Sequence, residues 1–77
     1  MQSDTGAISA TDAKLVYMAN QIARFFAGQS HDEAVSGIEN HLRRYWDPRM
    51  RSKLLGVIAA GGDGLDPLAR EAADRLK

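Results

Sequence analysis

The sequence predicts an all-α protein, a compact bundle of four short helices preceded by a flexible N-terminal tail at residues 1–11. Four successive segments carry apolar residues at spacings of three and four, and residues that start and stop helices separate them. No segment shows β-branched residues alternating with a period of two. The chain has 77 residues, the length of one domain, so residues 12–77 are predicted to form a single helical domain.

The first helix is predicted at about residues 12–27. Its main apolar residues recur at helical spacing and share one face: Leu15, Met18, Ile22 and Phe25. A second apolar row widens this face: Val16, Ala19, Ala23 and Phe26. This helix is therefore expected to pack on more than one side. Gly28 follows it and provides a natural stop, because glycine tolerates positive φ.

The second helix is predicted to start after Ser30 and to continue to Tyr45. Ser30 and Glu33 have the spacing of a capping box, in which a hydroxyl and a carboxylate satisfy free backbone N–H groups. The apolar face of this helix is Val35, Ile38, Leu42 and Tyr45. Gly37 lies within the helix and costs it about 1 kcal/mol relative to alanine, which suggests the close approach of a neighbouring helix.

The third and fourth helices each begin with an Asp-Pro pair, at residues 47–48 and 66–67. Aspartate is a favourable N-cap, and proline at the first helical position loses no hydrogen bond. The third helix is expected to bury Met50, Leu54, Val57 and Ile58 and to end at residues 61–62. The fourth has a narrow apolar stripe: Leu65, Leu68, Ala69, Ala72 and Leu76.

Composition and charge exclude several classes of function. Ten basic and ten acidic residues give a net charge of zero, which disfavours a general binder of nucleic-acid phosphates. The absence of cysteine excludes disulfides, thiolate zinc sites, iron–sulfur ligation and a cysteine nucleophile. The longest apolar stretch, residues 54–60, is too short to span a membrane, and no secretory signal is visible. The protein is expected to be soluble and cytoplasmic.

No catalytic, cofactor-binding or metal-binding residue is predicted. His31 and His41 have no partner at the spacing of known zinc motifs. Ser30, His31 and Asp32 are adjacent in the chain, which suits a helix cap and not a hydrolytic triad. Residues 61–64 are rich in glycine but lack the Gly-Lys-Ser/Thr ending of a phosphate-binding loop, so a helix stop followed by a tight turn is the better interpretation.

The most distinctive segment is residues 41–53, with four arginines, one lysine, two aromatic residues and a single acid. Arginine and large aromatic residues dominate the energetically important parts of protein interfaces. The segment therefore predicts a partner-binding surface, here named the basic–aromatic corner: Arg43, Arg44, Tyr45, Trp46, Arg49 and Arg51. In a second interpretation, Tyr45 and Trp46 anchor the core and the arginines form a solvated face.

Nucleic acid is a further candidate partner for this corner. The tight turn at residues 45–48 is compatible with a helix-turn-helix arrangement whose second helix enters a groove. Acidic residues elsewhere in the chain would oppose a broad phosphate footprint: Asp32, Glu33, Glu39, Asp63, Asp66, Glu71 and Asp74. We therefore expect the corner to bind a protein.

Several segments together resemble the delta subunit of soluble NAD-dependent formate dehydrogenases. The resemblance begins with residues 14–26 and continues through residues 31–38 and 41–42. Its most specific part is the string Trp-Asp-Pro-Arg-Met-Arg within residues 45–51, supported by the glycine-rich turn and Leu-Asp-Pro-Leu at residues 61–68. It covers about residues 14–76, which is essentially the whole predicted helical domain.

The resemblance implies a non-catalytic accessory subunit. In that family the whole complex oxidises formate to carbon dioxide and reduces NAD. Its larger subunits carry a molybdenum or tungsten bis-pterin guanine dinucleotide centre, iron–sulfur clusters and FMN, and this chain is expected to bind none of them. The implied partner is the catalytic alpha subunit, whose assembly, cofactor insertion or stability the chain would support. The alternative is a transient assembly chaperone that leaves the mature enzyme.

Overall fold

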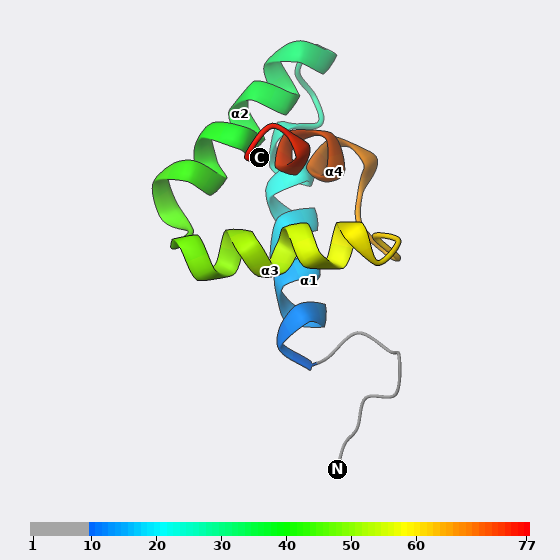
Figure 1. Cartoon of the computed structure of the whole chain (residues 1–77). Coiled ribbons are helices and arrows are strands. Elements are labelled where there is room, and N and C mark those ends of the chain that lie inside the picture. Colours follow the sequence, from blue (N-terminus) through cyan, green and yellow to red (C-terminus); the bar gives the residue numbers. More distant parts are fainter. Residues whose placement is uncertain (1–9) are drawn as a thin grey trace.

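The computed structural model describes residues 10–77 and contains four helices within them (Figure 1). They are α1 (Ala10–Phe26), α2 (His31–Tyr45), α3 (Pro48–Ala59) and α4 (Pro67–Asp74). The described part of the chain contains no strand, so the predicted all-α class is confirmed. The last two residues of the predicted tail belong to α1, and its residues 1–9 lie outside the described residues.

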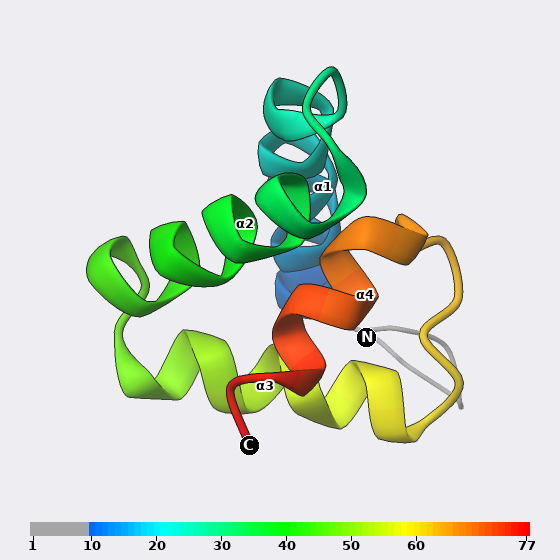
Figure 2. The same cartoon turned by 90° about the horizontal axis from the view of Figure 1, so that it is seen from above.

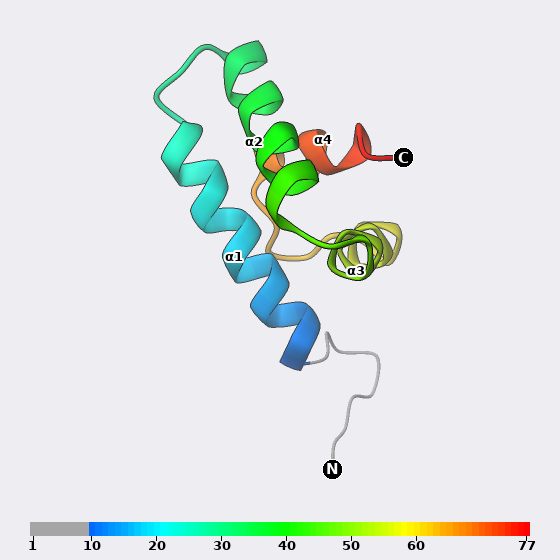
Figure 3. The same ribbon diagram turned by 90° about the vertical axis from the view of Figure 1, so that its left-hand side faces the viewer.

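The helices pack around α2 and α4. Figure 3 shows α1 and α2 side by side and antiparallel, while α3 is seen nearly end-on and so crosses α1 steeply. Figure 2 shows α2 and α3 diverging from the turn that joins them, with α4 between them. The contact between α2 and α4 is the most extensive, and α4 also touches α1 and α3. The shortest helix therefore lies against all three others.

The core combines a few large side chains with many alanines. Its largest fully buried side chains come from α2 and α3: Val35, Ile38, Leu42 and Leu54. Burying each of these stabilises the fold by about 1.5–3 kcal/mol. Six fully buried alanines surround them: Ala19, Ala23, Ala34, Ala69, Ala72 and Ala73. Because a methyl group occupies little space, α4 lies close to its neighbours although none of its buried side chains is large.

The predicted starts of α2, α3 and α4 are confirmed by their capping contacts. The Ser30 hydroxyl accepts a hydrogen bond from the Glu33 backbone N–H at 3.3 Å. The Asp47 carboxylate accepts one from the backbone N–H of Met50 at 2.9 Å. In α4, the Asp66 carboxylate accepts one from the Leu68 N–H at 2.8 Å. These side chains satisfy donors that the first turn of a helix leaves without an intrahelical partner.

A close approach explains the glycine within α2. A Cβ atom added at Gly37 would lie 2.5 Å from Cε1 of Phe26, so the aromatic ring of α1 occupies the space of a side chain. The close approach expected from the sequence is confirmed, and its partner is a ring and not a helix backbone. Phe26 thereby fastens the end of α1 to the first half of α2.

The connection between α3 and α4 is held on α1 by one amide side chain. Asn20 donates a hydrogen bond to the Gly64 carbonyl at 2.9 Å and accepts one from the Asp66 N–H at 2.8 Å. Gly61, Gly62 and Gly64 have positive φ values, which glycine adopts without steric cost. The predicted helix stop and tight turn are confirmed, and Asn20 holds the residues just before α4 against α1.

Two glycine substitutions should have opposite effects on stability. Gly56 is exposed within α3, and an added Cβ meets nothing within 4 Å, so Gly56→Ala should raise the free energy of unfolding by about 0.5–1 kcal/mol. Gly62 has a φ of +68°, and its added Cβ would lie 3.1 Å from Nη1 of Arg70. Gly62→Ala should therefore lower the free energy of unfolding by about 1–2 kcal/mol. Urea unfolding followed by circular dichroism measures both changes, and a destabilising Gly56→Ala would contradict the open space at α3.

Candidate partner-binding surface

Trp46, the largest residue of the basic–aromatic corner, lies in the core. It follows α2 directly in an extended conformation, and its backbone N–H donates to the Leu42 carbonyl at 3.2 Å. Its side chain is only 4% exposed and belongs to the central apolar cluster. The indole therefore points inward and anchors the turn between α2 and α3. The core-anchor interpretation describes Trp46, whereas Tyr45 beside it is 68% exposed.

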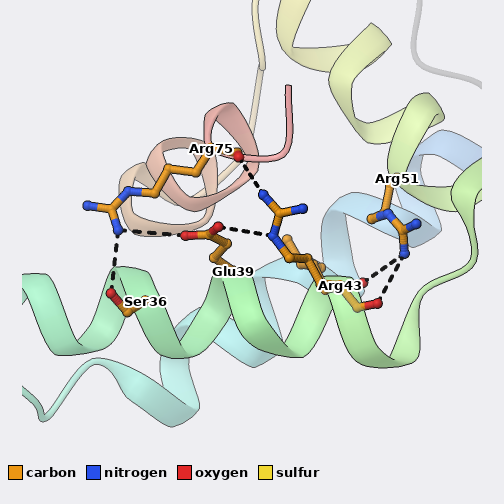
Figure 4. A network of polar contacts seen from close by, with 6 residues as sticks. Ser36, Glu39, Arg43, Arg51 and Arg75 are labelled. Atoms are coloured by element: carbon orange, nitrogen blue, oxygen red, sulfur yellow. Dashed lines mark hydrogen bonds and ion pairs between the residues drawn. The ribbon is translucent and has the colours of Figure 1, made fainter.

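Arg51 binds the end of the preceding helix. Its Nη1 atom donates to the carbonyl oxygens of Leu42 at 3.4 Å and Arg43 at 3.3 Å (Figure 4). It also donates to the carbonyl oxygen of Trp46. The last carbonyls of a helix lack intrahelical donors and carry its partial negative charge. A half-buried guanidinium on α3 thus caps α2 and holds the angle between the two helices.

Arg43 belongs to a network that joins α2 to the end of α4 (Figure 4). Its Nε atom donates to the Glu39 carboxylate at 3.0 Å, and its Nη2 atom donates to the Arg75 carbonyl at 2.7 Å. The Arg75 guanidinium lies 3.7 Å from the same carboxylate and donates to the Ser36 hydroxyl at 3.4 Å. Arg43 therefore contributes to the packing of α4 on α2.

Three residues of the corner project outward, and we name them the outer corner: Arg44, Tyr45 and Arg49. All three are exposed. The Cζ atom of Arg44 lies 6.0 Å from the centroid of the Tyr45 ring, within cation–π range. Within residues 10–77, no carboxylate forms an ion pair with Arg44 or Arg49. The two cations are therefore available to a partner.

The two histidines have structural contacts. The His31 Nε2 atom lies 2.9 Å from the Glu71 carboxylate, which links the start of α2 to α4. The His41 ring packs against Tyr45 with the centroids 4.8 Å apart. In the part of the chain that the structure describes, no group of three or more potential ligand side chains could hold a metal ion. No helix there is long and apolar enough to cross a membrane.

Two residues that helical spacing predicts to be buried are exposed. The spacing places Phe25 on the apolar face of the first helix and Tyr45 on that of the second, yet Phe25 is 79% exposed and Tyr45 68%. Successive residues point about 100° apart around a helix, so Phe25 and Phe26 cannot both face Gly37, and Phe26 occupies that position. The core thus covers only part of each apolar stripe, and Phe25 and Tyr45 are the members that it leaves exposed.

An apolar pocket of about 300 Å³ opens beside these residues. Its lining comes from α1 and α2: Gln21, Ile22, Phe25, Phe26 and His41. We name it the aromatic groove. Sequence reasoning missed it, although the adjacent Phe25 and Phe26 opposite a glycine in the next helix were a usable signal.

Comparison with known families identifies the chain. The model of the family described as NADH-dependent formate dehydrogenase delta subunit FdsD matches residues 14–73. The chain belongs to this family. Neither the search of curated proteins nor the search of solved structures finds a match.

The FdsD match contains both surface features. All six residues of the basic–aromatic corner and all five that line the aromatic groove fall within residues 14–73. Arg75, which completes the network between α2 and α4, lies just after it. Membership of a delta-subunit family implies that the other subunits of a formate dehydrogenase complex are the partners of this chain.

Replacing Trp46 should affect folding before it affects binding. Trp46→Ala leaves a large cavity and should cost about 3–5 kcal/mol, a large part of the roughly 4–12 kcal/mol expected for a domain of this size. Trp46→Phe keeps an aromatic ring and should cost less. Urea unfolding followed by circular dichroism tests this, and a Trp46→Ala chain as stable as the native one would contradict the anchoring role.

Substitutions of Arg51 and Arg49 should differ in their effect on stability, although the two residues are only two positions apart. Arg51→Met keeps an apolar stem but loses the hydrogen bonds to α2, so the free energy of unfolding should fall by about 1–3 kcal/mol. Arg49→Met removes an exposed charge and should change it by less than about 0.5 kcal/mol. Equal effects in thermal unfolding would show that the cap on α2 contributes nothing to stability.

Proposed function

We propose that the chain is a non-catalytic accessory subunit that binds the catalytic alpha subunit of a cytoplasmic formate dehydrogenase. It supports the assembly, cofactor insertion or stability of that subunit. The observation that carries this proposal is the match of residues 14–73 to the delta-subunit family. A small helical chain with outward-facing interface residues suits a role in which binding, and not chemistry, is the contribution.

The outer corner is the proposed contact with the alpha subunit. Arg44 and Arg49 present planar guanidinium groups, which bind carboxylates through two parallel hydrogen bonds. Tyr45 adds a large exposed ring with a polar end. We therefore infer that the alpha subunit offers an acidic surface here. Arg43, Trp46 and Arg51 act as positioning residues, because their contacts hold the corner in shape.

The proposed role places the redox groups in the larger subunits. Those groups are a molybdenum or tungsten bis-pterin guanine dinucleotide centre, iron–sulfur clusters, FMN and bound NAD. Iron–sulfur clusters are held mainly by cysteine thiolates, and this chain has no cysteine. The chain then contributes to the reaction indirectly. It increases the amount or the stability of the alpha subunit that contains its cofactors.

Charge reversal at the outer corner tests the docking surface. Arg44→Glu and Arg49→Glu should each weaken binding to the alpha subunit about fivefold or more, because attraction to carboxylates becomes repulsion. Lys14→Glu makes the same reversal of charge at an exposed position of α1 and serves as the control. Titration of purified alpha subunit with each tagged chain gives the dissociation constants. Binding unchanged by both corner variants would remove this surface from the proposal.

The purified complex also distinguishes an accessory subunit from a transient chaperone and from a nucleic-acid-binding module. The chain should be present in the purified, active complex in stoichiometric amount, as measured by intact-mass analysis. Its presence only in immature enzyme would indicate a transient chaperone. Retardation of nucleic acid by the chain in a low-salt gel would support a nucleic-acid module, and we expect none.

A further inference from the structure

The aromatic groove is an apolar surface that the fold leaves open. Phe25 forms one wall and is 79% exposed, although burying a phenylalanine side chain is worth about 1.5–3 kcal/mol. Large apolar groups left uncovered beside a pocket mark sites of interaction. The groove lies between α1 and α2, which run side by side (Figure 3).

The groove is held in shape by its inner wall. The Phe26 ring packs over Gly37, and the Phe25 ring meets it edge to face, with centroids 5.2 Å apart and an interplanar angle of 88°. On the other side, His41 packs against Tyr45 at 4.8 Å. A surface already ordered before binding loses little conformational entropy when a partner arrives. The walls are therefore suited to receive a side chain without rearrangement.

The charge near the groove is positive. None of its lining residues is acidic. Contacts lead from His41 to Tyr45 and from Tyr45 to the Arg44 guanidinium, and the exposed Arg24 precedes Phe25 in the last turn of α1. In the described residues, no carboxylate forms an ion pair with Arg24 or Arg44. A complementary occupant carries apolar side chains flanked by carboxylates.

These features favour an amphipathic helix as the occupant of the groove over a second copy of the chain or a small molecule. A second copy of the chain in a two-fold contact would bring Arg24 and Arg44 close to the same cations, which repel. A small molecule would stay largely in water, because Phe25, one of the walls, is mostly exposed, whereas ligand pockets enclose most of a ligand's surface. An amphipathic helix laid along two antiparallel helices covers such a surface and inserts one or two side chains.

We propose that the aromatic groove binds an acidic amphipathic helix of the alpha subunit, with an aliphatic or aromatic side chain of that helix inserted between Phe25 and His41. This inference rests on the proposed function and adds a second contact beside the outer corner. Tyr45 of the outer corner packs against His41 of the groove, so the two surfaces adjoin and one partner can cover both.

The test uses the complex of the tagged chain with the alpha subunit. Phe25→Asp should raise the dissociation constant about tenfold or more, because it removes the apolar wall and places a negative charge before acidic side chains. Ala13→Asp is the control, since Ala13 is an exposed residue near the start of α1 that does not line the groove. It should change the constant less than about threefold. Both variants should keep the native midpoint of urea unfolding, because both side chains are exposed.

A photo-reactive phenylalanine analogue in place of Phe25 identifies the occupant. Cross-linking to a helical, acidic segment of the alpha subunit supports the proposal, and cross-linking to another subunit or to a segment without acids overturns it. Sedimentation of the native chain should show a monomer. A dimer that Phe25→Asp dissociates would make a second copy the occupant and would also overturn it.

The outcomes separate this inference from the proposed function. If the native chain binds the alpha subunit and Phe25→Asp binds equally well, the groove has no role in docking and the accessory function stands. If the native chain does not bind the alpha subunit, the proposed function and the inference both fail.

Discussion

The buried row of α2 is the interaction on which the rest of the structure depends. Val35, Ile38 and Leu42 are fully buried, and the helix that carries them contacts both α1 and α4. Among the described residues, Leu54 is the one other large aliphatic side chain that is fully buried. An isolated helix as short as α4 is unstable in water, so α4 exists because α2 offers it an apolar surface and the Glu39–Arg43–Arg75 network holds its end.

The helices could be predicted from sequence because their signals are local. Capping residues such as Asp47 and Asp66 act within three residues of themselves, and glycine at positive φ stops a helix wherever it occurs. No proline or capping box precedes α1, so the local signal for its start is weaker. The start at Ala10 accordingly differs from the expected residue 12.

The candidate site could be predicted only as a segment. Composition places four arginines and two aromatic rings between residues 41 and 53, but the role of each depends on how α3 turns back on α2. Arg51 faces the last carbonyls of α2 while Arg49 faces outward. Spacing also could not decide between Phe25 and Phe26, because either ring continues an apolar stripe and only the position of α2 selects Phe26. The roles of the arginines and the choice between Phe25 and Phe26 both depend on contacts between helices. The sequence pattern of one helix does not determine such contacts.

The alanine contact between α4 and its neighbours restricts how this protein can diverge. Ala69, Ala72 and Ala73 have no exposed surface. A larger side chain at any of these positions therefore has to push α4 away from the helices it packs against. Arg70 and Glu71, on the outside of the same helix, are under no such restriction. The outer side of α4 can therefore accept larger side chains, whereas the inner side has to remain small, and changes of residue size in this subunit should accumulate where α4 faces solvent.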